Sequence, residues 1–229
     1  KAVGVADFDR SRETLSFPQP IPLATGGGEP VAMSALMLEG GPAVAIVVRE
    51  RRDHVLELHR PGMEAVTIAL EDVRRPPQSI LAADFDGDEH DDLLLFTPGE
   101  PMVMVRTSGE ATPGVVLTDE TMGQFGLVEG AGPENTALLD VDGNGSLELL
   151  IADANFIRAC SFEPDFGWRV VQQVTATDPS TQFESLALIR DEASPYPGTG
   201  VAASDSANDR IVVVGGRGGD WGVIDTLRL

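Results

Sequence analysis

Residues 83–95 read ADFDGDEHDDLLL, and residues 139–150 read LDVDGNGSLELL. In both segments an oxygen-bearing side chain occupies positions 1, 3, 5 and 9 of a loop that leads into an apolar run. These side chains are, in the first loop, Asp84, Asp86, Asp88 and Asp92, and in the second loop, Asp140, Asp142, Asn144 and Glu148. Hard oxygen ligands at alternate positions of one tight loop are typical of a Ca²⁺ site. Position 7 of such loops usually contributes its main-chain carbonyl, which predicts that role for His90 and Ser146.

Two other interpretations of these loops fit the sequence less well. An EF-hand requires Gly at position 6, Glu at position 12 and a helix on each side. Here Gly stands at position 4, and position 12 is Leu95 in the first loop and Ile151 in the second. The flanking apolar runs are short, which favours buried strands over helices. The other interpretation is an acidic, solvated turn without metal, and two copies between apolar strands disfavour it.

The shared pattern, Asp-x-Asp-Gly-Asp/Asn-x-x-x-Asp/Glu-Leu between apolar strands, resembles the FG-GAP and VCBS repeat family. The match covers residues 84–93 and 140–149 and is poor elsewhere. Members of this family are blades of integrin-α-like β-propellers and of many bacterial surface proteins. The resemblance implies blades of four antiparallel strands, with Ca²⁺ in the loop that joins the first two strands of a blade.

A longer repeat supports the same fold class. Short apolar segments that would form the outer strands are centred on Leu15, Val66, Val116, Val170 and Val223, and successive spacings are 51, 50, 54 and 53 residues. A period of about 50 residues with four short strands per unit indicates a β-propeller blade. The sequence therefore predicts an all-β fold with a half blade at 1–24 and blades at 31–75, 79–120, 135–178 and 184–229.

The ends of this array carry further expectations. Residues 1–6 and Thr14–Phe17 would form the third and fourth strands of the half blade, with residues 7–9 in the turn between them. In the last blade, residues 190–192 replace the acidic triplet and the loop continues through Pro-Tyr-Pro at 195–197, so this blade should lack a metal. Related rings have roughly seven blades. We therefore expect further blades, or a second subunit, to complete the ring.

Composition excludes some classes of function. The formal net charge is −21 and the sequence pI is about 4.3, so the chain repels nucleic acids and anionic membranes. No apolar run approaches the roughly 18 residues of a membrane span, and we expect no membrane insertion. The single cysteine, Cys160, lies in an alternating stretch and is interpreted as a small strand residue. The sequence begins with Lys1 and shows no signal peptide, so its true start is expected to lie upstream.

The sequence contains no nucleophile–base–acid motif and no P-loop, and we do not expect an enzyme. We predict a non-catalytic propeller, stabilised by two Ca²⁺ ions, that acts as a protein-interaction or scaffold module. Sites of this kind work best where Ca²⁺ is abundant, which is outside the cytoplasm. We therefore expect an extracellular, cell-surface or periplasmic protein. One alternative is a glycan-binding propeller, because Trp168 and Trp221 recur at the start of the fourth strand of two blades. Another is the non-catalytic part of a propeller enzyme such as a polysaccharide lyase.

Overall fold

The described part of the chain is almost entirely β-structure. The structure is a computed structural model, and it describes residues 2–229 except 7, 10, 108–113, 190–199 and 218–219. Among these residues the one helix is a short 3-10 turn, η1 (Phe125–Leu127). No helix in the described ranges has the length and apolarity that crossing a membrane requires. The predicted all-β class is confirmed.

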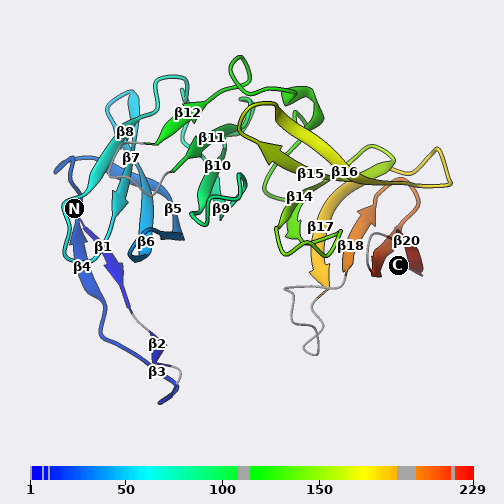
Figure 1. Cartoon of the computed structure of the whole chain (residues 1–229), viewed down its shortest axis with the longest axis horizontal. Coiled ribbons are helices and arrows are strands. Elements are labelled where there is room, and N and C mark those ends of the chain that lie inside the picture. The colour runs from blue at the N-terminus through cyan, green and yellow to red at the C-terminus, as the bar shows by residue number, and fades with distance from the viewer. Residues whose placement is uncertain (1, 7, 10, 108–113, 190–199, 218–219) are drawn as a thin grey trace.

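Four antiparallel sheets of four strands each follow one another along the chain (Figure 1), with neighbouring strands hydrogen-bonded in chain order. The first sheet contains β5 (Glu29–Leu38), β6 (Gly41–Glu50), β7 (Asp53–His59) and β8 (Val66–Ala69). The second contains β9 (Ser79–Ala83), β10 (Asp92–Phe96), β11 (Val103–Arg106) and β12 (Val115–Leu117). The third contains β13 (Thr136–Leu139), β14 (Glu148–Asp153), β15 (Phe156–Glu163) and β16 (Gly167–Thr175). The fourth contains β17 (Phe183–Ile189), β18 (Gly200–Asp205), β19 (Arg210–Arg217) and β20 (Asp220–Arg228).

The second strands of the second and third sheets explain how the four sheets stack. All five residues of β10 are buried, and after Asp92 its sequence is a continuous apolar run rather than an alternating one. Leu93 and Leu95 join the core cluster shared with the first sheet, whereas Leu94 and Phe96 join the cluster shared with the third. Alternate side chains of a strand point to opposite faces. The second sheet is therefore packed face to face between its two neighbours.

The third sheet repeats this arrangement. Leu149 and Ile151 of β14 belong to the cluster between the second and third sheets. Leu150 and Ala152 belong to the cluster between the third and fourth sheets. Each cluster is thus built from two consecutive sheets, and the hydrophobic core is a series of layers rather than one centre.

The N-terminal region differs from its predicted form. Strand β1 (Ala2–Val5) pairs with β4 (Gln19–Pro22), and a distal two-stranded piece pairs β2 (Phe8–Asp9) with β3 (Thr14–Leu15). The predicted fourth strand, Thr14–Phe17, is therefore wrong: its place beside β1 is taken by β4, because the hairpin is longer than expected. Phe8 and Asp9, predicted to form the turn, are paired strand residues, and Asp7 lies outside the described residues.

Two other segments bear on the predictions. The Gly-rich connection between the second and third sheets contains η1, and it buries Met122 and Val128 in the core cluster between those sheets. The predicted loss of metal ligands at 190–192, and the Pro-Tyr-Pro excursion, lie outside the described residues.

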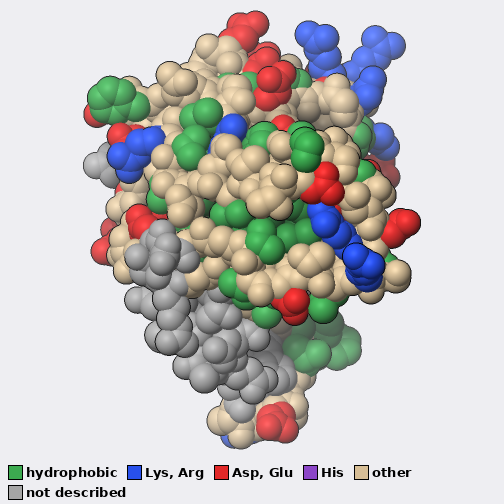
Figure 2. All heavy atoms as spheres, turned by 90° about the vertical axis from the view of Figure 1, so that its right-hand side faces the viewer, with side chains coloured by type: hydrophobic (Ala, Val, Ile, Leu, Met, Phe, Trp, Pro, Cys, Tyr) green, Lys and Arg blue, Asp and Glu red, His purple; other side chains and the backbone are tan. Residues whose placement is uncertain are grey.

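The outward side of the molecule at the fourth sheet carries hydrophobic side chains among the charged ones (Figure 2). On β20 the exposed apolar residues are Val223, Ile224 and Leu227.

Candidate metal sites

The first acidic loop, between β9 and β10, is organised by hydrogen bonds from its own backbone. Asp84 Oδ1 accepts hydrogen bonds from the amides of Gly87 (2.7 Å) and Asp88 (3.1 Å), and Asp84 Oδ2 accepts one from Glu89 (3.0 Å). Asp86 and Asp88 each accept one from the amide two residues further on, at 3.3 and 2.9 Å. These bonds fold the loop tightly and gather its carboxylates on one side.

The second loop, between β13 and β14, repeats this network. Asp140 accepts hydrogen bonds from the amides three, four and five residues further on, at 2.7, 3.1 and 2.9 Å. Asp142 and Asn144 each accept one from the amide two residues further on, at 3.0 and 2.7 Å. The position-4 glycines, Gly87 and Gly143, have φ of 79° and 80°, a left-handed conformation that favours glycine. The sequence similarity of the loops is therefore a similarity of backbone conformation.

The position-9 acids are buried beneath the loops. Asp92 is fully buried, and its two oxygens accept hydrogen bonds from the amides of Phe85 (3.3 Å) and Thr107 (2.9 Å). Burial, together with neighbouring carboxylates, raises the pKa of Asp92 to about 8. Glu148 accepts a hydrogen bond from the amide of Val141 (2.8 Å), and burial beside two aspartates raises its pKa to about 7. Carboxylates buried close together are destabilised unless a cation compensates them.

Both loops gather oxygen ligands closely enough to hold a metal ion. The carboxylates that each place one oxygen within 4.8 Å of the others are, in the first loop, Asp84, Asp86 and Asp88, and in the second, Asp140, Asp142 and Glu148. Asp92 lies outside the first set. Oxygen-only sets of this kind suit Ca²⁺.

The position-7 residues lie in the same networks. The amide of His90 donates to Asp88 Oδ1, and the amide of Ser146 donates to Asn144 Oδ1. The ring Nδ1 of His90 also lies 2.8 Å from the carbonyl oxygen of Asp88, and this hydrogen bond raises the pKa of His90. The contribution of the two main-chain carbonyls to a metal stays a prediction.

Two residues that sequence reasoning missed distinguish the loops. In the first, Arg106 donates from Nε to Asp86 Oδ2 at 2.8 Å, and its Nη2 forms a second contact with the same oxygen. In the second, Ser161 Oγ is buried and has no hydrogen-bond partner in the described structure. Both residues lie on the third strand of their sheet. Sequence reasoning could have found them only by predicting which residues of the third strand stand across from the position-9 acids.

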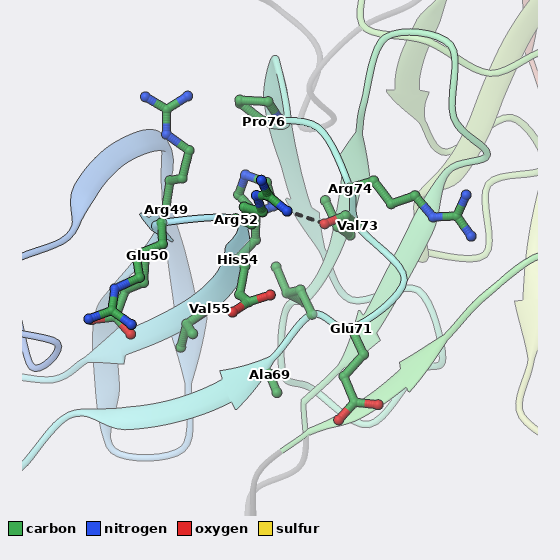
Figure 3. A pocket seen from close by; sticks show the side chains of 13 residues that line it. Arg49, Glu50, Arg52, His54, Val55, Ala69, Glu71, Val73, Arg74 and Pro76 are labelled. Carbon is green, nitrogen blue, oxygen red and sulfur yellow. Dashed lines mark hydrogen bonds between the residues drawn. The ribbon is translucent and has the colours of Figure 1, made fainter.

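A separate hollow of about 850 Å³ lies between the β6–β7 turn and the connection that follows β8 (Figure 3). Its charged lining residues are Arg49, Glu50, Arg51, Arg52, Asp53, Glu71 and Arg74. Arg49 and Arg74 extend away from the centre on opposite sides (Figure 3). His54 lies at the centre, where its Nδ1 lies 2.9 Å from the carbonyl oxygen of Val73. The hollow has mixed charge and no Phe, Tyr or Trp ring.

A buried carboxylate ties the N-terminal segment to the first sheet. Glu57 of β7 is fully buried, and it accepts hydrogen bonds from the amides of Ala24 and Thr25, both 2.9 Å, and from the Thr25 hydroxyl at 2.7 Å. His59 Nε2 lies 2.7 Å from the same carboxylate. Burial opposes ionisation, but these hydrogen bonds outweigh it and lower the pKa of Glu57. The ring of His59 thus has a hydrogen-bond partner in the protein.

The two tryptophans considered for glycan binding are packing residues. Trp168 is only 1% exposed, and its Nε1–H donates to Met122 Sδ at 2.8 Å. Its ring packs edge to face against Phe85 and Phe162. Trp221 packs against the core cluster between the third and fourth sheets. Trp168 therefore offers no surface for a sugar. Cys160 is likewise buried, which confirms its interpretation as a strand residue.

Comparisons with known proteins identify the fold. No protein-family model and no curated protein matches the sequence. A protein from Lactobacillus plantarum matches in structure with a TM-score of 0.53 and 10% identity, over 97% of this chain and 62% of that one. A candidate 6-phosphogluconolactonase from Bacteroides uniformis matches with a TM-score of 0.50 and 11% identity, over 98% of this chain and 63% of that one. This chain thus spans less than two thirds of either structure.

At such low identity the likeness concerns the fold alone. The matched structures are propellers, and the sheets of this chain have the strand number, strand order and face-to-face stacking of propeller blades. The four sheets of this chain are consecutive blades of a β-propeller.

Proposed function

We propose that this chain is a non-catalytic, calcium-stabilised propeller of the FG-GAP and VCBS type, which acts outside the cytoplasm as a protein-interaction or scaffold module. The observation that carries the proposal is the repetition of one loop conformation in two blades. Both loops use the same backbone hydrogen bonds and have oxygen-bearing side chains at the same four positions, although the blades differ in most other residues. A solvated turn without metal does not require oxygen-bearing side chains at the same four positions in two blades.

The residues present fit a calcium ion. All the grouped ligand atoms are carboxylate oxygens, which Ca²⁺ prefers. On β15, Ser161 Oγ is a buried polar atom without a partner in the described structure, and the strand register puts Ser161 across from the buried Glu148. Buried polar groups normally have a partner, and an unsatisfied one needs an explanation such as a missing water or ion. An ion or its water ligand would supply the missing partner.

Bound calcium would offset the repulsion among the clustered carboxylates of each loop. Asp84 and Asp140 hold the turn, and the residues at positions 3 and 5 complete the ring of oxygens. Asp92 and Glu148 begin the second strand of their blades, so a cation that attracts them ties this strand to the loop. Each site would thus stabilise the joint between the first two strands of a blade.

Exposed apolar side chains support a role in interaction. The β2–β3 hairpin projects away from the sheets (Figure 1). Leu15 in β3 is 70% exposed, and Phe17, just after β3, is 84% exposed. The outward face at the fourth sheet is also partly apolar (Figure 2). Exposed apolar groups of this kind mark contact surfaces. We propose that a protein partner, or further blades or another subunit that complete the ring, covers them.

Two alternatives remain as proposals of lower rank. A glycan-binding propeller would use exposed aromatic platforms, and the burial of Trp168 disfavours the pair of tryptophans that suggested it. An enzyme is suggested by the name of the Bacteroides uniformis protein and by polysaccharide lyases that use propellers. A propeller fold hosts many unrelated functions, so the fold does not favour this activity.

The calcium function is tested by its effect on stability. At about 1 mM Ca²⁺ and a Kd near 10⁻⁵ M, each site adds about 2.7 kcal/mol to the free energy of unfolding. A chelator should therefore lower the Tm by roughly 5 to 10 °C per occupied site. The double variant Asp84→Asn/Asp140→Asn should lose this response, whereas the exposed control Asp165→Asn should keep it. A parent protein whose Tm ignores both calcium and chelator would refute the proposal.

A further inference from the structure

The two acidic loops differ at one position of the neighbouring strand. In the second blade, Leu93 of β10 pairs with Val105 of β11, so the next residue, Arg106, stands across from Asp92. In the third blade, Leu149 of β14 pairs with Cys160 of β15, so Ser161 stands across from Glu148. Residues directly across an antiparallel pair lie on the same face, about 5 Å apart. Arg106 and Ser161 therefore occupy the same place beneath their loops.

Arg106 already supplies a positive charge to the first loop. Its guanidinium contacts Asp86 Oδ2 through two nitrogens, and the remaining Asp86 oxygen accepts the amide of Asp88. The Asp86 side chain is only 1% exposed, whereas that of Arg106 is 28% exposed. A charge-assisted pair in so buried a position is strong. Both oxygens of the position-3 ligand are thus occupied without any metal.

The second loop has no such cation. Ser161 is neutral and short, and its Oγ has no partner. Asp142, the position-3 ligand here, accepts one hydrogen bond through Oδ1, and no hydrogen bond or ion pair in the described structure engages its Oδ2. The position-3 carboxylate of this loop is therefore open to a cation.

We infer that Arg106 is a built-in counter-cation that sets the calcium dependence of the first loop. It competes with Ca²⁺ for Asp86, so the second loop is the tighter site, and the first loop keeps its shape without metal. This inference rests on the proposed calcium function. A count of the ligand charges alone would give the opposite order, because Asn144 in place of an aspartate leaves the second loop with one charge fewer. When only the four ligand positions and the cross-strand residue are counted, both sites carry the same net charge: four acids and Arg106 in the first, three acids in the second.

Exchanging the two residues tests the inference. Arg106→Ser gives the first loop the partner of the second, and Ser161→Arg does the reverse. Each loop is measured alone by calorimetric titration with Ca²⁺, with the other loop silenced by Asp140→Asn or Asp84→Asn. Repulsion between a unit charge and a divalent ion about 6 Å apart corresponds to between about tenfold and ten-thousandfold in affinity. Arg106→Ser should tighten the first site by a factor in this range, and Ser161→Arg should weaken the second.

Controls separate charge from structure. Arg106→Lys keeps the positive charge, so the first site should stay weak. In chelator, Arg106→Ser should lower the Tm, because Asp86 becomes a buried, unpaired charge, and added Ca²⁺ should restore it. If Arg106→Ser were too unstable to purify, Ser161→Arg would still test the inference in the other blade.

The outcomes distinguish this inference from the proposed function. Two calcium sites of which the first is the tighter, or a first site unchanged in Arg106→Ser, would overturn the role of Arg106 and leave the calcium function intact. A parent protein that binds no Ca²⁺ in either loop would overturn both.

Discussion

Truncating Trp168 should weaken the packing between the second and third blades and so lower the stability of the protein. The side chain is fully buried between them and contacts Phe85, which lies inside the first acidic loop, and Phe162. A buried tryptophan removes about 200 Å² from water, worth about 5 kcal/mol at roughly 25 cal/mol per Å². Measured Trp→Ala losses in cores are about 3 to 5 kcal/mol. For a chain of this length, Trp168→Ala should therefore lower the Tm by roughly 6 to 20 °C.

Differential scanning calorimetry in saturating Ca²⁺ measures this loss. The matched control is Phe166→Ala, in the turn that precedes β16, because Phe166 is 74% exposed. Its truncation should change the free energy of unfolding by no more than about 0.5 kcal/mol. If Trp168→Ala lost no more than this control, the layers between consecutive blades would not be what holds the propeller together, and the packing argument would fail.

Three further predictions concern single buried groups. Glu57→Gln should cost about 1.5 to 3 kcal/mol, measured by denaturant unfolding, because the hydrogen bonds from Ala24 and Thr25 lose their charged acceptor. The lowered pKa of Glu57 means that its stabilisation is present above the unfolded carboxyl pKa and is lost as pH falls through the folded one; a parent and variant with the same acid-unfolding curve would contradict this. Burial alone would raise the pKa of Asp205, but hydrogen bonds, first among them that from the Gln182 amide, lower it to about 2, so its stabilisation should disappear between about pH 4 and pH 2 and be absent in Asp205→Asn. Burial raises the pKa of Cys160 to about 11, so a thiol reagent should modify it only after unfolding, and rapid labelling of the native protein would contradict its burial.

The blades could be predicted from sequence because their inner strands are unambiguous. The run Leu93-Leu94-Leu95-Phe96 is too short for a core helix and apolar on both faces, which only a strand packed between two sheets requires. The N-terminal hairpin was misplaced because β3 is exposed, and an exposed strand does not fix its own register. Sequence alone could not decide whether Thr14–Phe17 or Gln19–Pro22 pairs with β1.

The acidic loops could be predicted because their ligands are close in sequence and the spacing itself describes the turn. Arg106 and Ser161 could not, because they reach the loops from the third strand of each blade, and only the strand register brings them there. Glu57 was missed for a similar reason. A glutamate in an amphipathic strand suggests a solvent-facing residue, and its partners lie more than thirty residues earlier in the chain.

Counting bound calcium tests the central claim most directly. After equilibrium dialysis against about 1 mM Ca²⁺, elemental analysis should find two ions per chain in the parent protein. Asp140→Asn should retain one ion, and Asp84→Asn/Asp140→Asn should retain none. A parent that holds no calcium, or a double variant that holds as much as the parent, would contradict the account of these loops as calcium sites.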